Sequence, residues 1–284
     1  MTIDEIIESA LQEDIGEGDH TTLATIPVTL KGKARLIIKS NGILAGINIA
    51  EKVFHKVDPA LSIKIFMKDG DRVKEQDIAM EVEGSSRSIL MAERVMLNFL
   101  QRLSGIATAT RAMVDQLAGL KTQVLDTRKT TPNLRELEKY AVSIGGGVNH
   151  RSGLYDMILI KDNHVDYMGS PAIAIIAVQK YLKKNNMDLK IEVEVRNFEE
   201  LIDVMNHGGV DRIMLDNFSV EDTRDAVQLI DGAFQTESSG GINLNNARKY
   251  AEAGVDFISV GFLTHNIHSL DMSLKAVRPL HIIR

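Results

Sequence analysis

The fold of this chain is indicated first by residues 190–195, KIEVEV, an apolar run rich in β-branched side chains that precedes the helical pattern Phe198–His207. A second apolar run, RIML at residues 212–215, follows and is succeeded by another helical pattern at Val220–Ile230. Strands that alternate with helices in this way indicate parallel strands buried on both faces. The stretch therefore predicts an α/β architecture.

The same alternation extends on both sides of this stretch. Four more apolar runs are expected to be strands: Gln123–Leu125, Met157–Ile160, Phe234–Thr236 and Phe257–Val260. Three more segments have helical spacing: Leu134–Ile144, Pro171–Lys184 and Leu244–Ala253. About six such units in ~150 residues favour a TIM-like α/β barrel with fewer than the usual eight strands, and an open doubly wound sheet is the alternative.

The first part of the chain has a different pattern. Thr2 and Glu5 have the spacing of a capping box, which predicts a helix from there to about Leu11. Residues 33–82 consist mostly of short β-like runs, and helical patterns follow at 88–103 and 108–118. We therefore expect an N-terminal α/β sandwich-like domain at residues 1–105, the barrel at 106–265, and a C-terminal helix at 266–284 that packs back on the first domain.

Composition and charge exclude several classes of protein. The chain has no cysteine, which excludes disulfides, thiolate nucleophiles and cysteine-ligated metals, and which fits a reducing compartment. A formal net charge of −6 argues against a nucleic-acid partner held by a positive field. The longest apolar runs are too short to cross a membrane, and no basic, apolar signal peptide is visible at the N-terminus. We expect a cytoplasmic protein with no nucleic-acid or membrane partner.

A polar or glycine-rich segment follows each predicted strand of the barrel. In TIM-type barrels the active site is built at the carboxyl ends of the strands. The segments found there are DTRK at 126–129, KDNH at 161–164, Glu194, DN at 216–217, SGG at 239–241 and Gly261. Because all six strand ends have this character, a site at this edge of the barrel is predicted.

Five basic residues lie at or near these strand ends: Arg128, Lys129, His150, Arg151 and Lys161. Convergence of several cations in an acidic chain predicts an anionic ligand, with arginine suited to planar carboxylates and lysine to phosphate. The alternative is a set of solvated surface residues paired with Glu136, Glu138 and Asp156.

Acidic and glycine-rich segments complete the predicted site. Glu194 and Asp216 end consecutive strands and could hold Mg²⁺ or ribose hydroxyls, or could pair with Lys161 or Arg128. The glycine-containing loops at 238–242 and 260–265 follow the last two strands, where TIM-type barrels commonly bind phosphate through backbone N–H groups.

Taken together, these segments resemble the quinolinate phosphoribosyltransferase family. The matching segments are EDIGEGDHTT (13–22), AERVMLN (92–98), LSGIAT (103–108), DTRKTTP (126–132), HR (150–151), KDNH (161–164), EVEV (192–195), LDN (215–217) and SGGI (239–242). The resemblance covers essentially the whole chain. It implies a sandwich-like domain followed by an open TIM-like barrel, and an enzyme that transfers the phosphoribosyl group of phosphoribosyl pyrophosphate to quinolinate with decarboxylation, giving nicotinate mononucleotide for NAD biosynthesis.

The resemblance also assigns roles to individual residues. It implies a homodimer in which Arg94 of one subunit reaches the partner's site and joins the residues expected around the two carboxylates of quinolinate, Arg128, His150 and Arg151. The residues expected to face phosphoribosyl pyrophosphate and its Mg²⁺ are Lys129, Lys161, Glu194 and Asp216. Those expected near the 5′-phosphate are Ser239, Gly240, Gly241, Gly261 and His265.

Some choices stay open at this level. Glu192 is an alternative to Glu194 because both lie on the same face of one strand. Whether dimers assemble further into hexamers is also open. The competing functions are a related phosphoribosyltransferase-like protein acting on another acid, such as the homologue associated with molybdenum transport operons, and a non-catalytic barrel that binds anions.

Overall fold

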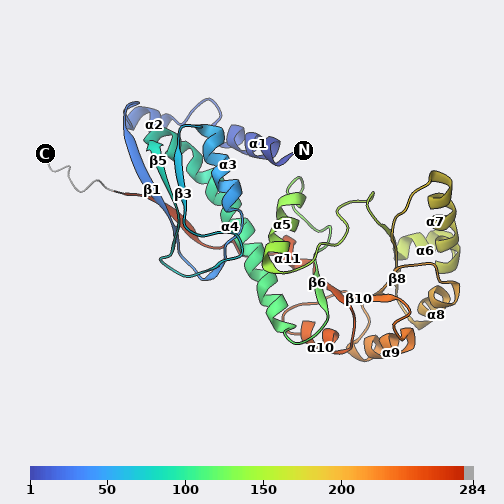
Figure 1. Ribbon diagram of the computed structural model, residues 1–284. Helices are drawn as coiled ribbons and strands as arrows, with labels where there is room; N and C mark the ends of the chain where they lie inside the picture. The colour runs from blue at the N-terminus through green and yellow to red at the C-terminus, as the bar shows by residue number, and fades with distance from the viewer. Residues whose placement is uncertain (278–284) are drawn as a thin grey trace. The chain divides into compact units, whose positions relative to one another are not determined.

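The computed structural model describes residues 1–277 and divides the chain into two compact units (Figure 1). The first contains residues 1–111, 131–146 and the described residues from 266, and the second contains residues 112–130 and 147–265. These bounds differ from 1–105 and 106–265 chiefly because α5 (Arg135–Gly145) groups with the first unit. The buried Glu138 of α5 accepts a hydrogen bond from Arg102 Nε at 2.8 Å, which fixes α5 against α4.

The first unit combines helices with a four-stranded antiparallel sheet in the order β12-β1-β5-β3. Its strands are β1 (Lys31–Ile38), β3 (Ser62–Ile65), β5 (Ile78–Ser85) and β12 (Met272–Ala276), and β2 (Gly42–Ile43) pairs separately with β4 (Arg72–Val73). Helix α1 (Ile3–Ile15) begins with the predicted capping box, and α2 (His20–Thr25) follows. Helix α3 (Ile47–Val57) was not predicted; it buries Ala50, Val53 and Phe54 at helical spacing.

The end of the described chain is a strand and not the expected helix. Met272–Ala276 forms β12 and pairs antiparallel with β1, with Ile38 opposite Met272 and Ala34 opposite Ala276. Met272 and Leu274 are buried while Lys275 is exposed, the period-two pattern of a strand with one buried face. The expectation of a helix at 266–284 is therefore wrong for the described residues, and positions 278–284 lie outside them.

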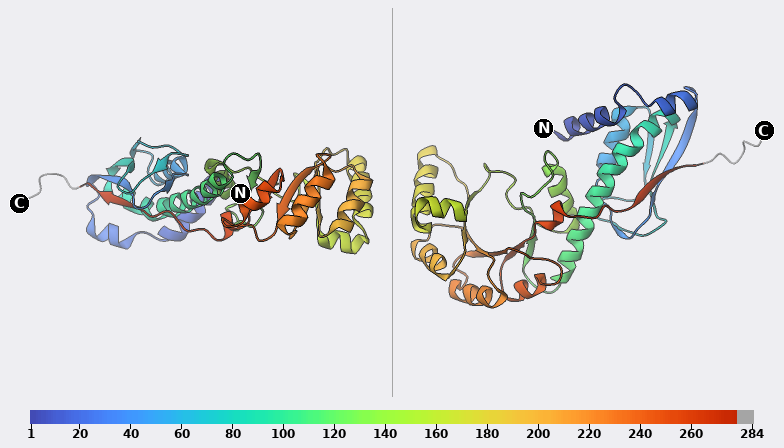
Figure 2. Two further views of the ribbon diagram at one scale, coloured as in Figure 1. Left: turned by 90° about the horizontal axis from the view of Figure 1, so that it is seen from below. Right: turned by 180° about the vertical axis from the view of Figure 1, so that it is seen from behind.

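The two helical patterns at 88–103 and 108–118 form one helix, α4 (Ser86–Gln116), of 31 residues (Figures 1 and 2). Gly105 interrupts the apolar pattern without interrupting the helix. A Cβ at this position would lie 3.1 Å from both the His268 carbonyl carbon and the Ser269 Cα. Glycine is thus required here by the close approach of another backbone segment within the first unit.

Gly105→Ala is expected to destabilise the protein by at least about 2 kcal/mol, because backbone atoms must move to admit the methyl group. Thermal or urea unfolding would measure it. The sign of this change in stability is informative, because replacing glycine by alanine within a helix ordinarily stabilises a protein by about 1 kcal/mol. Ala109→Gly, one turn further along α4, provides the matched control and should cost about 1 kcal/mol through helix propensity alone. A Gly105→Ala variant as stable as the wild type would contradict this view of the packing.

The second unit contains a parallel sheet of six strands in the order β7-β8-β9-β10-β11-β6. The strands are β6 (Gln123–Leu125), β7 (Ile158–Ile160), β8 (Ile191–Val195), β9 (Arg212–Asp216), β10 (Gln235–Ser239) and β11 (Phe257–Ser259). From β7 to β11 each strand pairs with the next in sequence, and β6 then follows β11, so the order never reverses as it does in a doubly wound sheet. This is the winding of a barrel that is open between β6 and β7.

Helices α6 to α10 connect these strands and lie outside the curved sheet, and α11 follows β11 (Figures 1 and 2). They are α6 (Asp162–Met168), α7 (Pro171–Asn185), α8 (Phe198–His207), α9 (Val220–Ile230), α10 (Ala247–Glu252) and α11 (Phe262–His265). The core between helices and sheet includes the fully buried Val193, Ile213 and Leu215. Among residues 1–277 no helix is both long and apolar enough to cross a membrane.

Candidate active site

A cavity of about 710 Å³ lies at the carboxyl ends of the barrel strands, and all of its lining residues belong to the second unit. The predicted site residues that line it are Arg128, Lys129, His150, Arg151, Lys161, Glu194, Asp216, Ser239, Gly240, Gly241, Gly261 and His265. Arg94 belongs instead to α4 in the first unit, where it is exposed. The fold therefore places every predicted site residue around one cavity except Arg94, the residue that was expected to reach a partner subunit.

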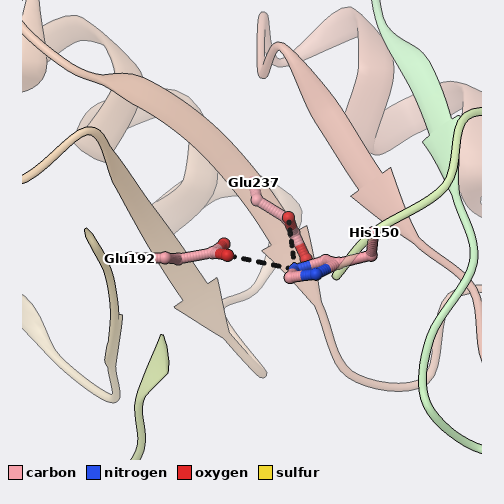
Figure 3. Close-up of side chains that lie close together, drawn as sticks. All are labelled: His150, Glu192 and Glu237. Atoms are coloured by element: carbon pink, nitrogen blue, oxygen red, sulfur yellow. Dashed lines mark ion pairs between the residues drawn. The ribbon is translucent and has the colours of Figure 1, made fainter. Parts of the chain in front are cut away.

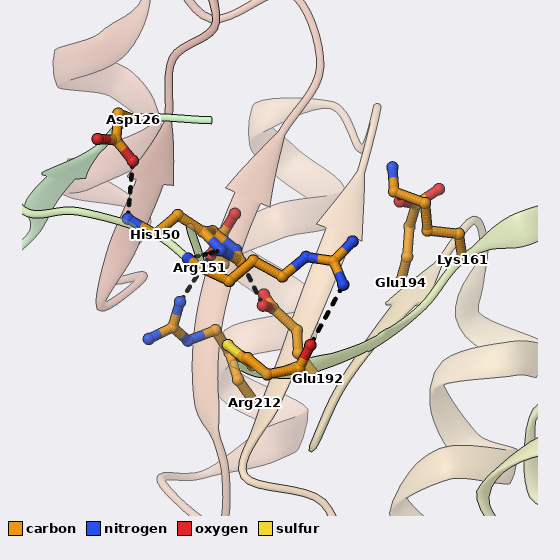
Figure 4. Close-up of polar contacts among 9 residues, drawn as sticks. Asp126, His150, Arg151, Lys161, Glu192, Glu194 and Arg212 are labelled. Carbon is orange, nitrogen blue, oxygen red and sulfur yellow. Dashed lines mark hydrogen bonds and ion pairs between the residues drawn. The ribbon is translucent and has the colours of Figure 1, made fainter. Parts of the chain in front are cut away.

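An extended segment beside β6 positions His150 and Arg151. Val148 forms a parallel bridge with Leu125, and its N–H donates to the Val124 carbonyl at 2.8 Å. The His150 N–H then donates to Oδ1 of the buried Asp126, also at 2.8 Å (Figure 4). Asp126, at the end of β6, thus holds the segment that carries two of the basic residues.

Two buried carboxyl groups lie beside His150, Glu192 from β8 and Glu237 from β10 (Figure 3), and of the two only Glu237 lines the cavity. His150 Nε2 lies 3.0 Å from Glu192 Oε2 and 3.5 Å from Glu237 Oε2. Arg212 Nη1 donates to Glu237 Oε2 at 2.9 Å, and its guanidinium stacks 4.0 Å above the Phe257 ring. Burial raises the pKa of Glu192, and burial together with the neighbouring Glu192 raises the pKa of Glu237 to about 8.

Arg151 is a buried cation at the same place (Figure 4). Its Nη1 donates to the Met157 carbonyl at 3.2 Å. Burial, and then the positive charge of Arg128, lower the pKa of Arg151, while Glu192 and Asp156 oppose that change. The fold therefore holds two guanidinium groups close enough to repel each other, an arrangement that a bound dianion would stabilise.

Glu194 lines the cavity. Glu192, two residues earlier on the same face of β8, is fully buried and does not line it. Lys161 Nζ, at the end of β7, lies 3.4 Å from Glu194 Oε2. Burial is the main cause that raises the pKa of Glu194, with Lys161 opposing it and Asp216 adding to it. Glu194 and Asp216 thus form a carboxylate pair at the cavity wall, and geometry favours Glu194 over Glu192 as the residue that faces a ligand.

Glycine-rich turns after β10 and β11 form another part of the wall. Gly240 and Gly241 have φ of +97° and +61°, and a Cβ on Gly240 would overlap the Asn217 amide. A Cβ on Gly261 would lie 3.0 Å from Lys129 Cδ, so the absence of a side chain there leaves room for that lysine. Thr264 Oγ1 donates to the Lys129 carbonyl at 2.8 Å and holds the Lys129 backbone beside this turn.

Sequence reasoning missed Glu237, Arg212 and the structural role of Asp126. Glu237 stands two residues before Ser239 in β10, so strand alternation places both on one face. That period could have identified Glu237, but the expected strand, Phe234–Thr236, ended too early. Of the acids considered as surface partners, Glu138 binds Arg102, and Asp156 accepts the N–H groups of Ser152 and Gly153.

The raised pKa of Glu237 predicts a specific dependence of stability on pH. The unfolded chain ionises this group near pH 4.5, whereas the folded protein retains the proton up to about pH 8. The folded state therefore loses stability relative to the unfolded state as pH rises through this window. We expect the free energy of unfolding of the wild type, measured relative to Glu237→Gln in urea, to fall between pH 5 and pH 9.

The matched control is Glu252→Gln, which removes a half-exposed carboxylate paired with Arg248 on α10. Relative to this variant, the wild type should show no such fall. A wild type that gains stability against Glu237→Gln as pH rises would mean that the buried carboxyl is ionised in the folded protein.

An open α/β barrel whose strand ends carry arginines, lysines and paired carboxylates belongs to the class of barrel enzymes that bind acidic and phosphorylated small molecules. Family models narrow the class: residues 19–104 match the N-terminal domain, and residues 106–275 the C-terminal domain, of quinolinate phosphoribosyl transferase. The chain belongs to the quinolinate phosphoribosyl transferase family.

Individual relatives agree with this assignment. A Nicotiana glauca protein named quinolinate phosphoribosyltransferase [decarboxylating] 1 is 44% identical over 95% of this chain and 81% of its own length. A Bacillus subtilis protein named probable nicotinate-nucleotide pyrophosphorylase [carboxylating] is 40% identical over 96% of this chain and 93% of its own. The crystal structure of NadC from Streptococcus pyogenes superposes with a TM-score of 0.92 at 41% identity, covering 97% of each chain.

Proposed function

We propose that the protein transfers the phosphoribosyl group of phosphoribosyl pyrophosphate to quinolinate with loss of CO₂, producing nicotinate mononucleotide and pyrophosphate for NAD biosynthesis. Relatives named for this reaction, at 40–45% identity over most of the chain, support the proposal. The structural observation that carries it is the close pair Arg128 and Arg151 in a cavity that also presents Lys129 and Lys161. Two planar guanidinium groups suit a dicarboxylate, and lysines suit phosphate groups.

The charges of the cavity fit the two chemical steps. The ring nitrogen of quinolinate displaces pyrophosphate at the anomeric carbon of ribose, and the departing pyrophosphate gains stabilisation from Lys129 and Lys161. Arg128 and Arg151 would orient the diacid for that attack, which can contribute several kcal/mol. After the first step, CO₂ leaves from the carboxylate next to the ring nitrogen, and the electron pair of the broken C–C bond stays on the ring carbon. The positive charge of the adjacent pyridinium nitrogen stabilises this carbanion until a proton from water replaces the lost CO₂, so decarboxylation needs no separate general base.

Glu194 and Asp216 fit a Mg²⁺ ion that arrives with phosphoribosyl pyrophosphate. Both line the cavity, and the charge of Asp216 contributes to the raised pKa of Glu194. Mg²⁺ usually takes one or two protein carboxylates and fills its other positions with water and substrate phosphates. A pair of carboxylates is therefore the donor set expected for it. When bound, the ion would neutralise the pyrophosphate charge.

The glycine turns fit the 5′-phosphate of the ribose. Backbone at positive φ, without side chains at Gly240 and Gly241, exposes N–H groups to a ligand, and Ser239 adds a hydroxyl. The exposed His265 and the turn at Gly261 line the same cavity. These residues would hold the phosphate through hydrogen bonds and leave Lys129 and Lys161 for the pyrophosphate.

We further infer a homodimer with shared active sites. The support is that Arg94, which lies on α4 outside the cavity-bearing unit, is exposed and available to a second subunit. Helices α6 and α7 also carry large exposed apolar side chains, Tyr167, Ile173, Ile176 and Tyr181, as subunit interfaces often do. Sedimentation of the purified protein would separate a dimer from a hexamer.

A cytoplasmic location is our inference from the cysteine-free sequence, which fits a reducing compartment. Some plant relatives are named chloroplastic or mitochondrial proteins. Cell fractionation with detection of the native protein tests this location.

The test of function is an assay of purified protein with quinolinate, phosphoribosyl pyrophosphate and Mg²⁺ that follows nicotinate mononucleotide and CO₂ together. We expect equal amounts of both products, and none when nicotinate replaces quinolinate. Turnover of a different aromatic acid alone would indicate a related enzyme with another substrate. Binding of quinolinate without release of pyrophosphate would indicate an anion-binding barrel.

A further inference from the structure

His164 belongs to the segment KDNH that follows β7, but it does not line the substrate cavity, whereas Lys161 and Asp162 do. It occupies the third helical position of α6, and its Nδ1 accepts a hydrogen bond from the backbone N–H of Lys161 at 2.9 Å. Lys161 is the N-cap residue of α6 and has extended backbone, with φ of −104° and ψ of 167°. The imidazole therefore reaches back to the residue that precedes its helix, as the third residue of a capping box does.

The main chain of Lys161 is held on both sides by this first turn of α6. The ladder between β7 and β8 ends with Ile160 opposite Val193, so the Lys161 N–H lies beyond it. The Lys161 carbonyl accepts the N–H groups of His164 and Val165, at 2.8 and 3.1 Å. The carbonyl is thus bound by main-chain groups, whereas the N–H is bound by a side chain, that of His164. A substitution at position 164 can therefore release one side of the Lys161 main chain while leaving the other bound.

The Lys161 side chain begins at this fixed main chain and reaches the cavity. Its Nζ lies 3.4 Å from Glu194 Oε2, and 46% of the side chain is exposed (Figure 4). A half-exposed lysine has many accessible rotamers, and a fixed starting point limits the volume that its ammonium group explores. The position of such a group matters, because a displacement of about 1 Å can cost about a hundredfold in rate.

Histidine is an unusual residue at this position of a capping box, where Glu or Gln is the common choice. A glutamate would bring a further negative charge next to Lys161, which is expected to bind phosphate groups and already pairs with Glu194. A neutral imidazole supplies the acceptor for the N–H without that charge. The residue type thus fits a cap placed directly beside a site for a polyanion.

We propose that His164 is a positioning residue for the reaction, which fixes Lys161 for phosphoribosyl pyrophosphate through a hydrogen bond to the lysine main chain. This role rests on the proposed function, because it depends on the part given there to Lys161. His164 acts without touching the substrate: it lines a separate cavity of about 310 Å³, together with the apolar side chains of Met168 and Ala174.

Two substitutions separate this role from simple packing. In His164→Gln the amide oxygen can still accept the Lys161 N–H, as in an ordinary capping box. In His164→Leu the apolar volume is kept and the acceptor is lost. We expect His164→Gln to bind phosphoribosyl pyrophosphate within about threefold of wild type and His164→Leu to bind it about tenfold more weakly, as measured by titration calorimetry. The affinity for quinolinate should change less than about threefold in both variants.

A double-mutant cycle shows whether His164 acts through the lysine. In a Lys161→Ala background, His164→Leu should weaken the binding of phosphoribosyl pyrophosphate by less than about twofold, because the group that it positions is gone. The matched control is Asp166→Asn, which disrupts the ion pair of 2.8 Å between α6 and Arg196. This substitution loosens α6 without touching the Lys161 main chain, and the affinity should stay within about twofold of wild type.

Hydrogen exchange of the Lys161 backbone amide gives a readout independent of any substrate. We expect slow exchange in the wild type and in His164→Gln, and exchange at least about tenfold faster in His164→Leu. Thermal unfolding confirms that each variant is folded, and His164→Ala replaces His164→Leu if the latter is not.

Three outcomes would overturn the proposal: equal amide exchange in the three proteins, a folded His164→Gln as impaired as His164→Leu, or the same loss of affinity from His164→Leu with and without Lys161. If the wild type does not bind phosphoribosyl pyrophosphate, the proposed function fails, while amide exchange still tests the hydrogen bond that holds Lys161.

Discussion

Arg128→Ala is expected to weaken quinolinate binding about a hundredfold, while changing the affinity for phosphoribosyl pyrophosphate by less than about threefold. Arg128 and Arg151 lie close enough for the charge of one to lower the pKa of the other. Removal of Arg128 leaves one carboxylate of the bound diacid without its bidentate partner in a partly buried cavity, where such a loss costs about 2–5 kcal/mol. Isothermal titration calorimetry with each substrate measures the two affinities separately from catalysis.

The matched control for this experiment is Arg224→Ala, which removes an exposed arginine on α9 and should leave both affinities unchanged. Equal losses of affinity for the two substrates in Arg128→Ala would refute its assigned role. They would indicate that Arg128 contributes general positive potential to the cavity and not a specific contact to the diacid.

Mixing two inactive variants, Arg94→Ala and Lys129→Ala, is expected to restore about a quarter of wild-type activity through hybrid dimers. In a hybrid, one site combines the intact Lys129 of one subunit with the intact Arg94 of the other, and the second site lacks both. Random exchange makes about half of all dimers hybrid, so about one site in four is complete. The assay is the rate of nicotinate mononucleotide formation after the subunits have exchanged.

Subunit exchange must be established independently, for example by native mass spectrometry of an isotope-labelled variant mixed with an unlabelled one. The control mixture of Lys129→Ala with Lys161→Ala should stay inactive, because both residues line the same cavity within one subunit. Confirmed exchange without recovery of activity would mean that Arg94 serves its own subunit or no active site at all.

The barrel was predictable from sequence because its periodic signals are strong and local. The bounds of α8 and α9 follow directly from apolar spacing and side-chain caps, Asn197 for α8 and Ser219 for α9. Two elements of the first unit were not predictable in the same way. Helix α3 contains β-branched residues that favour strand locally, and only packing of its apolar face favours a helix. Strand β12 depends on pairing with β1, more than 230 positions earlier in the sequence.

In the candidate site, too, residues identified by local sequence patterns were predictable, and residues placed by contacts between distant segments were not. Residues that directly follow strands, such as Lys161 and Asp216, are identified by position alone. The role of His150 depends on Val148 lying beside β6 and on carboxylates from β8 and β10 meeting beneath the ring. Those contacts join residues that are 23, 42 and 87 positions apart, and no local pattern encodes them.

The open barrel has a consequence for the kinetics of backbone amide exchange with solvent. Strands β9 and β10 have hydrogen-bonded neighbours on both sides, whereas β7 has only β8 among the described strands. Deuterium uptake in the native state should therefore be graded, slow at the middle of the sheet and faster toward the seam between β7 and β6. Lys161, after β7, and Lys129, after β6, both line the cavity, so a ligand that contacted both would bridge that seam. Bound substrate is then expected to slow deuterium uptake at the seam, because opening of the barrel there would break its contacts to one of the two lysines.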